Sequence, residues 1–291
     1  MTESVTVVIG ASNQIGYFLI PVLLAEGRQV IAVSRQALPS WFKCYANEPR
    51  LQWCNMEQFM QCKLSGGVNL VSSGPLHLAG NLATKLAPAK VIAISSASVL
   101  FKQHSPDSAE RESMANIIQA EQKLSHWAEK QQVDLHILQP TLVYGCGLDQ
   151  NISRVAGLIQ RFGFIPLASQ ALGLRAPVHA QDLANLIQQL LQQNPSGQFL
   201  WPLAGGSQLS YRQMLESVFT ALEKPVRFAV LPQWLLRLLS RMVTDMNSQM
   251  INRQSQDLCV DDAPARSQLH WNPRDFELQK GDLFTAPLVN P

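Results

Sequence analysis

VTVVIGASNQIG, residues 5–16, joins a short apolar run to a turn that begins and ends in glycine. The β-branched run at 5–9 predicts a buried strand, and the residues after Gly16 predict a helix that Gly27 ends. Such a turn leaves free backbone N–H groups at the positive end of the helix dipole, an arrangement that binds a pyrophosphate. The spacing matches the GxxGxxG variant of the dinucleotide-binding fingerprint, with Asn13 in place of the middle glycine.

Asn13 leaves two interpretations of this turn open. Asparagine tolerates a left-handed backbone better than most residues, so the turn can still form. Its side chain is nevertheless expected to project where the backbone of a cofactor would pass. The strand–turn–helix setting favours a dinucleotide-binding turn. The alternative is a turn that has lost its ligand.

The rest of the first half alternates apolar runs with helical stretches. Strand-like runs recur at 29–33, 68–71, 90–94 and 134–138, and a helix is expected at 116–131. Nearly continuous β-branched runs are typical of strands buried on both faces, as in a parallel sheet. We therefore predict an α/β fold with a doubly wound parallel sheet of the Rossmann type.

The alternation of strands and helices breaks after Gly145. Helices and short strands are expected at 152–162, 176–178, 183–193, 199–203 and 210–222. We assign residues 1–145 and 176–205 to the Rossmann domain and residues 146–175 and 206–291 to a smaller C-terminal substrate lobe. The lobe should close over the cofactor, with the main pocket between the two parts.

The composition describes an ordinary folded chain with no electrostatic preference for a large anionic partner. The 291 residues are 46% hydrophobic, and 23 basic against 21 acidic groups leave a net charge of +2. That balance argues against nucleic acid or an anionic membrane as a partner. The five cysteines contain no CxxC pair, so we propose no metal site and no disulfide framework.

The first residues lack the cationic region of a secretory signal, and no window of about 18 residues is apolar enough to span a bilayer. The nearest approach, residues 231–243, is expected to form a packed amphipathic helix, with a membrane-surface helix as the alternative. We expect a cytoplasmic protein, and the sequence leaves a homodimer open.

The second strand ends at Val33-Ser34-Arg35, where a carboxylate would normally bind the ribose 2′-hydroxyl of NAD. No Asp or Glu is present there. Ser34 can donate a hydrogen bond and Arg35 can bind a 2′-phosphate, which favours NADP over NAD. The alternative is an arginine that is simply solvated at a strand end.

Five segments in a fixed order carry a resemblance to a known family. The first is the glycine turn, and the others are ISSASV (94–99), QPTLVYG (139–145), RAPVHAQDLA (175–184) and LHWNP (269–273). Together they resemble the extended short-chain dehydrogenase/reductase family, the NAD(P)-dependent epimerase/dehydratase group. The resemblance implies a Rossmann domain with a C-terminal substrate lobe, in agreement with the pattern above.

The resemblance also implies a set of binding residues. The cofactor side comprises Gly10, Ser12, Asn13, Gln14, Ile15, Gly16, Ser34, Arg35, Asn55, Ser73, Gly74 and Pro140. The side that would bind a nucleotide-sugar-like small molecule comprises Asn151, Arg175 and His179. Each of these three has a structural alternative: a helix N-cap for Asn151, a surface salt bridge for Arg175, and a histidine that satisfies backbone groups for His179.

Members of the family usually act through a serine or threonine, a tyrosine, and a lysine four residues after the tyrosine. Here the serine falls on Ser96. Aligning Ala120-Glu121 with the family's Ala-Glu places Ser113 at the tyrosine position and Ile117 at the lysine position. No tyrosine in the chain has a lysine four residues later. A serine cannot replace a phenol as a proton shuttle without a strong neighbouring base, so we expect Ser113 to be inert.

Two functions follow from this pattern. The first is an NAD(P)-binding protein without the usual Tyr–Lys chemistry, which senses NADPH or serves in assembly. The alternative is an active NADP-dependent epimerase or reductase on a nucleotide-sugar-like substrate, using Ser96 and a base that is not a tyrosine.

Overall fold

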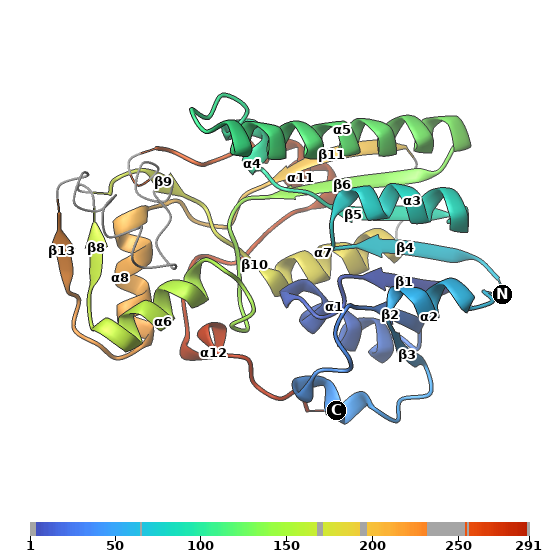
Figure 1. Cartoon of the computed structure of the whole chain (residues 1–291), viewed down its shortest axis with the longest axis horizontal. Coiled ribbons are helices and arrows are strands. Elements are labelled where there is room, and N and C mark those ends of the chain that lie inside the picture. The colour runs from blue at the N-terminus through green and yellow to red at the C-terminus, as the bar shows by residue number, and fades with distance from the viewer. Residues whose placement is uncertain are drawn as a thin grey trace.

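The computed structural model describes residues 4–64, 66–167, 171–192, 197–231, 254 and 256–289. Within these residues the largest sheet has seven strands, and every neighbouring pair in it is parallel (Figure 1). In sheet order the strands are β11 (Gln198–Leu203), β6 (Asp134–Pro140), β5 (Lys90–Ile94), β4 (Val68–Ser72), β1 (Val5–Ile9), β2 (Gln29–Val33) and β3 (Leu51–Cys54). The predicted doubly wound α/β fold is confirmed.

The direction of winding reverses beside β1. The chain runs outward through β2 and β3, then returns to β4 on the other side of β1 and continues through β5, β6 and β11. The carboxyl ends of β1 and β4 therefore border the crevice in which open α/β sheets bind their ligands. The glycine turn after β1 lies at this position.

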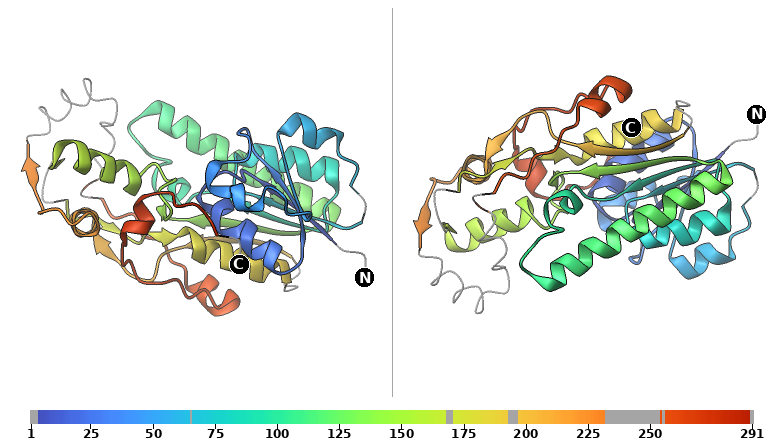
Figure 2. Two further views of the ribbon diagram at one scale, coloured as in Figure 1. Left: turned by 90° about the horizontal axis from the view of Figure 1, so that it is seen from below. Right: turned by 90° about the horizontal axis from the view of Figure 1, so that it is seen from above.

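Helices cover both faces of the sheet (Figure 2). One face carries α1 (Gln14–Ala25) and α7 (Ala180–Gln192), and the other carries α2 (Met56–Gln61), α3 (Leu76–Leu86) and α5 (Ser108–Gln131). Successive residues of β1 point to opposite faces: Val8 lies in the core under α1 and α7, and Val7 lies in the core under α3 and α5. This alternation explains why every position of the run except Thr6 is apolar.

A smaller part of the chain lies beyond the carboxyl ends of the strands. It contains α6 (Ile152–Phe162) and α8 (Tyr211–Ala221), and two short strand pairs, β8 (Ile165–Leu167) with β13 (Phe228–Val230) and β9 (Leu174–Arg175) with β12 (Leu209–Ser210). Its own core packs Ile152 and Ile159 of α6 against Leu215 and Phe219 of α8. Two further short elements, β7 (Val143–Tyr144) and β10 (Val178–His179), pair with each other and connect this part to the large sheet.

The C-terminal stretch contacts both parts of the molecule. Ala265 and Leu269 of α11 (Ala263–Leu269), followed by Trp271, lie in the core formed by α1 and α7. After α12 (Lys280–Leu283), the backbone N–H of Leu288 donates to the carbonyl of Trp41 in the short helix η1 (Ser40–Tyr45). Parts of the segment predicted for the lobe thus pack on the Rossmann domain.

The helix predicted at 116–131 is longer than expected. It begins at Ser108, because the Asp107 carboxylate accepts hydrogen bonds from the N–H groups of Ala109 and Glu110 and caps it. Most of the predicted helix at 231–243 lies outside the described residues. Among the described residues, no helix is both long and apolar enough to cross a membrane.

Candidate functional site

The glycine turn is closed so tightly that both of its end positions require glycine. Gly10 has a φ of +79°, and a Cβ there would lie 2.9 Å from the Ser73 Oγ and from the Gly74 nitrogen. A Cβ on Gly16 would lie 2.2 Å from the Ala11 carbonyl oxygen. The turn therefore packs directly against the end of β4 and against the first turn of α1.

Asn13 folds back over the start of α1. Its backbone is extended, with a φ of −94°, and does not adopt the left-handed conformation that the sequence allowed. Its Oδ1 accepts hydrogen bonds from the N–H groups of Ile15 at 2.9 Å and Gly16 at 3.0 Å. Its Nδ2 donates to the carbonyl and the hydroxyl of Ser73, both at 3.0 Å. The side chain thus caps the helix and stays within the turn.

Ser12 and Ser34 lie together at the carboxyl ends of β1 and β2. The Ser34 hydroxyl donates to the Ser12 hydroxyl at 2.8 Å and accepts from the N–H of Gln36 at 3.0 Å. Arg35 is exposed and makes no hydrogen bond or ion pair with the described residues. Asn55, which follows β3, caps α2 through a hydrogen bond from the Gln58 N–H at 2.9 Å.

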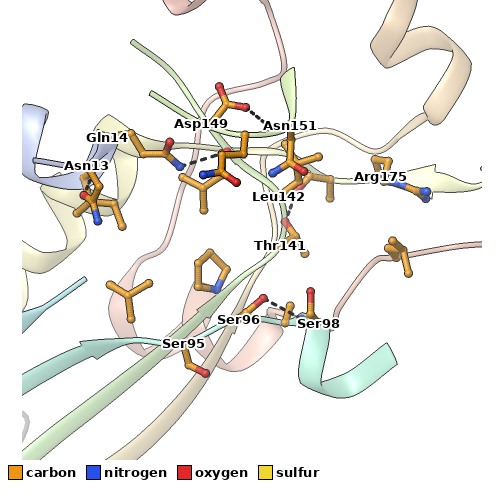
Figure 3. Close-up of a pocket in the computed structure, with 18 of the residues that line it drawn as sticks. Asn13, Gln14, Ser95, Ser96, Ser98, Thr141, Leu142, Asp149, Asn151 and Arg175 are labelled. Carbon is orange, nitrogen blue, oxygen red and sulfur yellow. Dashed lines mark hydrogen bonds between the residues drawn. The ribbon is translucent and has the colours of Figure 1, made fainter. Parts of the chain in front are cut away.

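A cavity of about 490 Å³ opens at the carboxyl ends of the strands (Figure 3). Figure 3 shows Asn13 and Gln14 on one side of it, Arg175 on the other, and Ser95, Ser96 and Ser98 along a third. Of the predicted residues, the cavity lining contains Asn13, Gln14, Ile15, Ser73, Ser96, Pro140, Asn151 and Arg175. The cavity thus joins the glycine turn, the central strands and the C-terminal elements.

Ser96 and Ser95 face different partners at the end of β5. The Ser96 hydroxyl accepts from the N–H of Ser98 at 3.1 Å, at the start of α4 (Ser98–Phe101). The Ser95 hydroxyl donates to Glu121 Oε1 at 2.5 Å, and Gln139 Nε2 donates to the same oxygen at 2.7 Å. Glu121 is a buried carboxylate of α5. Sequence reasoning did not identify this hydrogen-bonded group beside Ser96.

Ser113 and Ile117 lie in a second, larger groove between α3 and α5. Its volume is about 1020 Å³, and Ser73, Ser95 and Ser96 line both this groove and the first cavity. Gly74 also lines the groove. The structure therefore places Ser113 and Ser96 in the lining of the same groove, which polar and apolar side chains line together.

The first cavity also contains a tyrosine and a lysine that the sequence reasoning did not select. Tyr211 comes from the start of α8, and Lys102, which follows α4, lies 3.4 Å from the Glu110 carboxylate. Burial raises the pKa of Tyr211 and outweighs the lowering effect of the Arg175 charge. The Tyr211 phenol is therefore protonated at neutral pH and is no general base there.

Arg175 is buried and held in a fixed orientation. One of its terminal nitrogens donates to the carbonyls of Leu174 at 2.8 Å and Gln256 at 2.6 Å, and its guanidinium carbon lies 5.1 Å from the centre of the Tyr211 ring. A cation–π contact of this kind stabilises a buried guanidinium. The predicted substrate-side cation thus lines the cavity as a preoriented group.

Asn151 precedes α6 without capping it through its side chain. The carboxylate of Asp149 does so instead, accepting from the N–H groups of Asn151 at 2.8 Å and Ser153 at 3.2 Å. The structural alternative that the sequence suggested for Asn151 is therefore wrong, and its carboxamide is left at the cavity border (Figure 3).

His179 is not among the residues that line the first cavity. Its ring is buried between Tyr144 and Phe18, and Nε2 lies 3.1 Å from Oδ1 of Asp282. Nδ1 accepts from the N–H of Gln181 at 3.1 Å, so Nε2 carries the proton and donates to the carboxylate. This placement agrees with the structural alternative for His179. Among the described residues, no group of His, Cys, Asp and Glu side chains is arranged to hold a metal ion.

Part of the chain is similar in sequence to a known epimerase. No family model matches the chain. Over 168 residues it is 26% identical to a UDP-glucose 4-epimerase of Vibrio cholerae, a stretch that covers 58% of this chain and 50% of that protein. The match thus spans about half the length of that curated relative.

Solved structures match over nearly the whole chain. A UDP-glucose 4-epimerase of Thermotoga maritima with UDP-glucose has a TM-score of 0.67 at 13% identity and covers 97% of both chains. A UDP-glucuronic acid 4-epimerase of Bacillus cereus with NAD has a TM-score of 0.69 at 14% identity, covering 96% of this chain and 95% of the other. A UDP-glucose 4-epimerase of Bifidobacterium longum with NAD+ and UDP has a TM-score of 0.67 at 16% identity, covering 96% and 97%. The chain therefore shares its fold with these nucleotide-sugar epimerases and with a dTDP-glucose 4,6-dehydratase, in agreement with the resemblance to the extended short-chain dehydrogenase/reductase family that its sequence shows.

Proposed function

We propose that this chain is an NAD(P)-binding protein that binds a nucleotide-sugar-like molecule without the usual Tyr–Lys chemistry. One observation carries the proposal. The cavity at the winding reversal joins the glycine turn to Ser96, while Ser113 and Ile117 lie in the groove that Ser96 borders. The cavity supports ligand binding, whereas Ser113 and Ile117 supply neither a phenol nor an ammonium at the two α5 positions aligned with the family's tyrosine and lysine.

The turn and its surroundings fit a dinucleotide. Gly10 and Gly16 leave no room for side chains, so the turn closes tightly and α1 packs directly against it, as in a dinucleotide-binding turn. Within the described part of the chain the N–H groups of Ser12 and Gln14 have no hydrogen-bond partner and can donate to a pyrophosphate. Ser96 and Pro140 would lie at the nicotinamide end. When bound, the nicotinamide supplies a hydride acceptor or donor.

Arg35 supports NADP as the preferred cofactor. Its guanidinium is exposed and uncommitted among the described residues, beside the Ser12–Ser34 hydroxyl pair, and positions 34–36 contain no carboxylate to bind a ribose 2′-hydroxyl. Two of the similar structures named above, the UDP-glucuronic acid 4-epimerase of Bacillus cereus and the UDP-glucose 4-epimerase of Bifidobacterium longum, contain NAD, so the preference rests on the residues of this chain.

An anionic small molecule suits the other end of the cavity. Arg175 and Lys102 line it, and the Asp149 carboxylate is already occupied by the start of α6. Guanidinium groups bind phosphate oxygens well, because two N–H donors can meet two oxygens. We propose that Arg175 binds the diphosphate of a nucleotide sugar and that Asn151 contacts the same molecule.

The Ser95–Glu121 hydrogen bond favours a second candidate function. The buried Glu121 carboxylate accepts a hydrogen bond from Ser95, which is the residue next to Ser96 in the sequence. An ionisable group therefore lies close to Ser96. It is the feature that would support an active epimerase or reductase that uses Ser96 and a base other than tyrosine.

Calorimetric titration with NADPH and NADH tests the first proposal. We expect both to bind and NADPH to bind more tightly. Mixtures of the protein, NADPH and common nucleotide sugars should show no consumption of the cofactor. If neither cofactor binds at up to millimolar concentration, the proposed function is wrong. If cofactor is consumed and Ser96→Ala abolishes the turnover, the enzyme replaces the binding protein as the better description.

A further inference from the structure

The glycine turn uses most of its own backbone N–H groups. Those of Gly10 and Ala11 donate to the Val33 carbonyl, at 3.0 and 3.2 Å, and that of Asn13 donates to the Gly10 carbonyl at 3.1 Å. Those of Ile15 and Gly16, in the first turn of α1, donate to the Asn13 carboxamide oxygen. Only Ser12 and Gln14 keep N–H groups without a partner among the described residues.

Contacts with Ser73 determine which way the Asn13 carboxamide points. The Ser73 hydroxyl donates its single hydrogen to the Ile9 carbonyl at 3.0 Å, so it can only accept from Asn13. The Ser73 carbonyl, at 3.0 Å from Nδ2, also requires a donor. The amide nitrogen must therefore face Ser73 and the oxygen must face α1. A flip of the carboxamide would turn all four of these hydrogen bonds into unfavourable contacts.

The carboxamide oxygen stands where a bound phosphate oxygen would be held. At the start of a helix, the N–H groups of the first turn are the donors that a phosphate accepts from. Here two of these donors already have an acceptor from the same chain. A pyrophosphate must therefore either displace the Asn13 oxygen or bind only through the N–H groups of Ser12 and Gln14.

We infer that Asn13 is a built-in competitor of the dinucleotide pyrophosphate, and that it makes the cofactor a weakly held, exchangeable ligand. The inference rests on the proposed function and concerns the regulation of that same site. A cofactor that exchanges readily follows the concentration of the free dinucleotide. This behaviour suits a protein that senses NADPH better than one that keeps a resident cofactor through a reaction cycle.

Three substitutions at this position separate competition from a purely structural cap. Asn13→Gly removes the competing oxygen, and glycine is nearly as good an N-cap as asparagine, so the fold should persist. Asn13→Ala also removes the oxygen but keeps a Cβ. Asn13→Asp keeps the cap and adds a negative charge that repels a diphosphate, while it loses both donors to Ser73.

Calorimetric titration of the four proteins with NADPH measures the effect. We expect the dissociation constant to fall about ten-fold in Asn13→Gly, to fall less in Asn13→Ala, and to rise at least about ten-fold in Asn13→Asp, as expected for the loss or gain of one competing polar contact. Adenosine 2′-monophosphate, which has no pyrophosphate, should bind all four proteins with the same affinity. Thermal melting of each variant shows that it is folded.

The outcomes distinguish this inference from the function on which it rests. If the native chain and Asn13→Gly bind NADPH equally tightly, Asn13 does not compete, although the dinucleotide site stands. If Asn13→Asp binds as tightly as Asn13→Gly, the effect is structural and the inference is again wrong. If no variant binds any dinucleotide while all of them are folded, both the inference and the proposed function fail.

Discussion

At the scale of single residues, the two arginines proposed for ligand binding differ in how they are prepared for it. Arg175 is buried, stacked on Tyr211 and bonded to backbone carbonyls, so its orientation is settled before any ligand arrives. Arg35 is exposed and has no partner among the described residues, so a ligand must order it on binding. An exposed cation of this kind can select for the 2′-phosphate of NADPH without binding the rest of the dinucleotide.

Replacing Arg35 by alanine should therefore weaken NADPH binding selectively. One charge-assisted contact to a phosphate is worth about 1.5–3 kcal/mol, which corresponds to a loss of affinity of about ten-fold to a hundred-fold. NADH has no 2′-phosphate, so its affinity should change by less than about two-fold. Calorimetry with both cofactors measures the two effects.

Lys63→Ala is the matched control for this prediction. Lys63 is an exposed cation beside Val5 and Gln29, at the amino ends of β1 and β2, whereas Arg35 follows the carboxyl end of β2. The substitution Lys63→Ala removes the same charge far from the proposed cofactor site. If both variants weaken NADPH binding equally, the effect comes from the net charge of the protein and not from a contact between Arg35 and the 2′-phosphate. Equal weakening of NADH and NADPH by Arg35→Ala would remove the case for NADP.

At the scale of elements, the long helix α5 carries Ser113 and Ile117, the two positions on which the proposed absence of Tyr–Lys chemistry depends. Its start was missed because residues 108–113, SAERES, have no apolar periodicity, and its cap depends on the single residue Asp107. The strands β1, β2, β4, β5 and β6 could be predicted because each contains a nearly continuous apolar run, as is typical of strands buried on both faces. The edge strand β3 was missed, because its residues LQWC are few and include the exposed Gln52. The Ser95–Glu121–Gln139 group could not be predicted, since it joins single polar residues of three separate elements.

The spacing of Ser113 and Ile117 makes a gain of activity testable. Residues four apart lie on the same face of a helix, and both line the groove that Ser96 borders. The double variant Ser113→Tyr, Ile117→Lys should therefore place a phenol and an ammonium toward Ser96. If the cofactor and UDP-glucose bind, we expect turnover about 10²–10⁴-fold above that of the native chain, the usual contribution of a positioned acid–base group.

Both single variants are the controls, because neither supplies the pair. The absorbance of the reduced nicotinamide reports hydride transfer, and separation of UDP-sugars reports their interconversion. The double variant can bind both ligands and still show no turnover. In that case something other than the missing pair limits the chain, and the alignment of Ser113 with the tyrosine is in doubt.

At the scale of the whole molecule, the C-terminal segment connects the smaller part of the structure to the Rossmann domain through hydrogen bonds to both. The Asp282 carbonyl accepts from the Gly147 N–H at 2.9 Å, and Thr285 donates to the Cys146 carbonyl at 2.8 Å. Farther along, the Tyr17 hydroxyl of α1 donates to the Ala286 carbonyl at 2.9 Å. Figure 2 shows this segment crossing from the smaller part of the molecule to the helices of the large one. No local sequence signal predicts such contacts, because their partners are more than a hundred residues away.

The His179–Asp282 hydrogen bond anchors this segment, and it makes the stability of the fold depend on pH. Burial acts to raise the pKa of Asp282, but the hydrogen bonds from His179 and from the Gln279 N–H, with the nearby charge of Arg274, outweigh it and lower the pKa below its ordinary value. A carboxyl group with a lowered folded-state pKa stabilises the fold above its unfolded-state pKa. That contribution is lost as the pH falls through the lowered value.

Asp282→Asn should therefore destabilise the protein at neutral pH by about 1.5–3 kcal/mol, the value of a hydrogen bond to a charged group. The difference from the native chain should shrink below about pH 4, the ordinary range of an Asp carboxyl, and vanish once the native Asp282 is itself protonated. Urea unfolding at a series of pH values measures both quantities. Asp275→Asn, which removes a carboxylate of the same segment whose side chain has no partner among the described residues, should leave stability unchanged at every pH. A difference that persists undiminished into strong acid would show that the Asp282 charge is not what anchors the segment, and that its backbone contacts alone hold the two parts together.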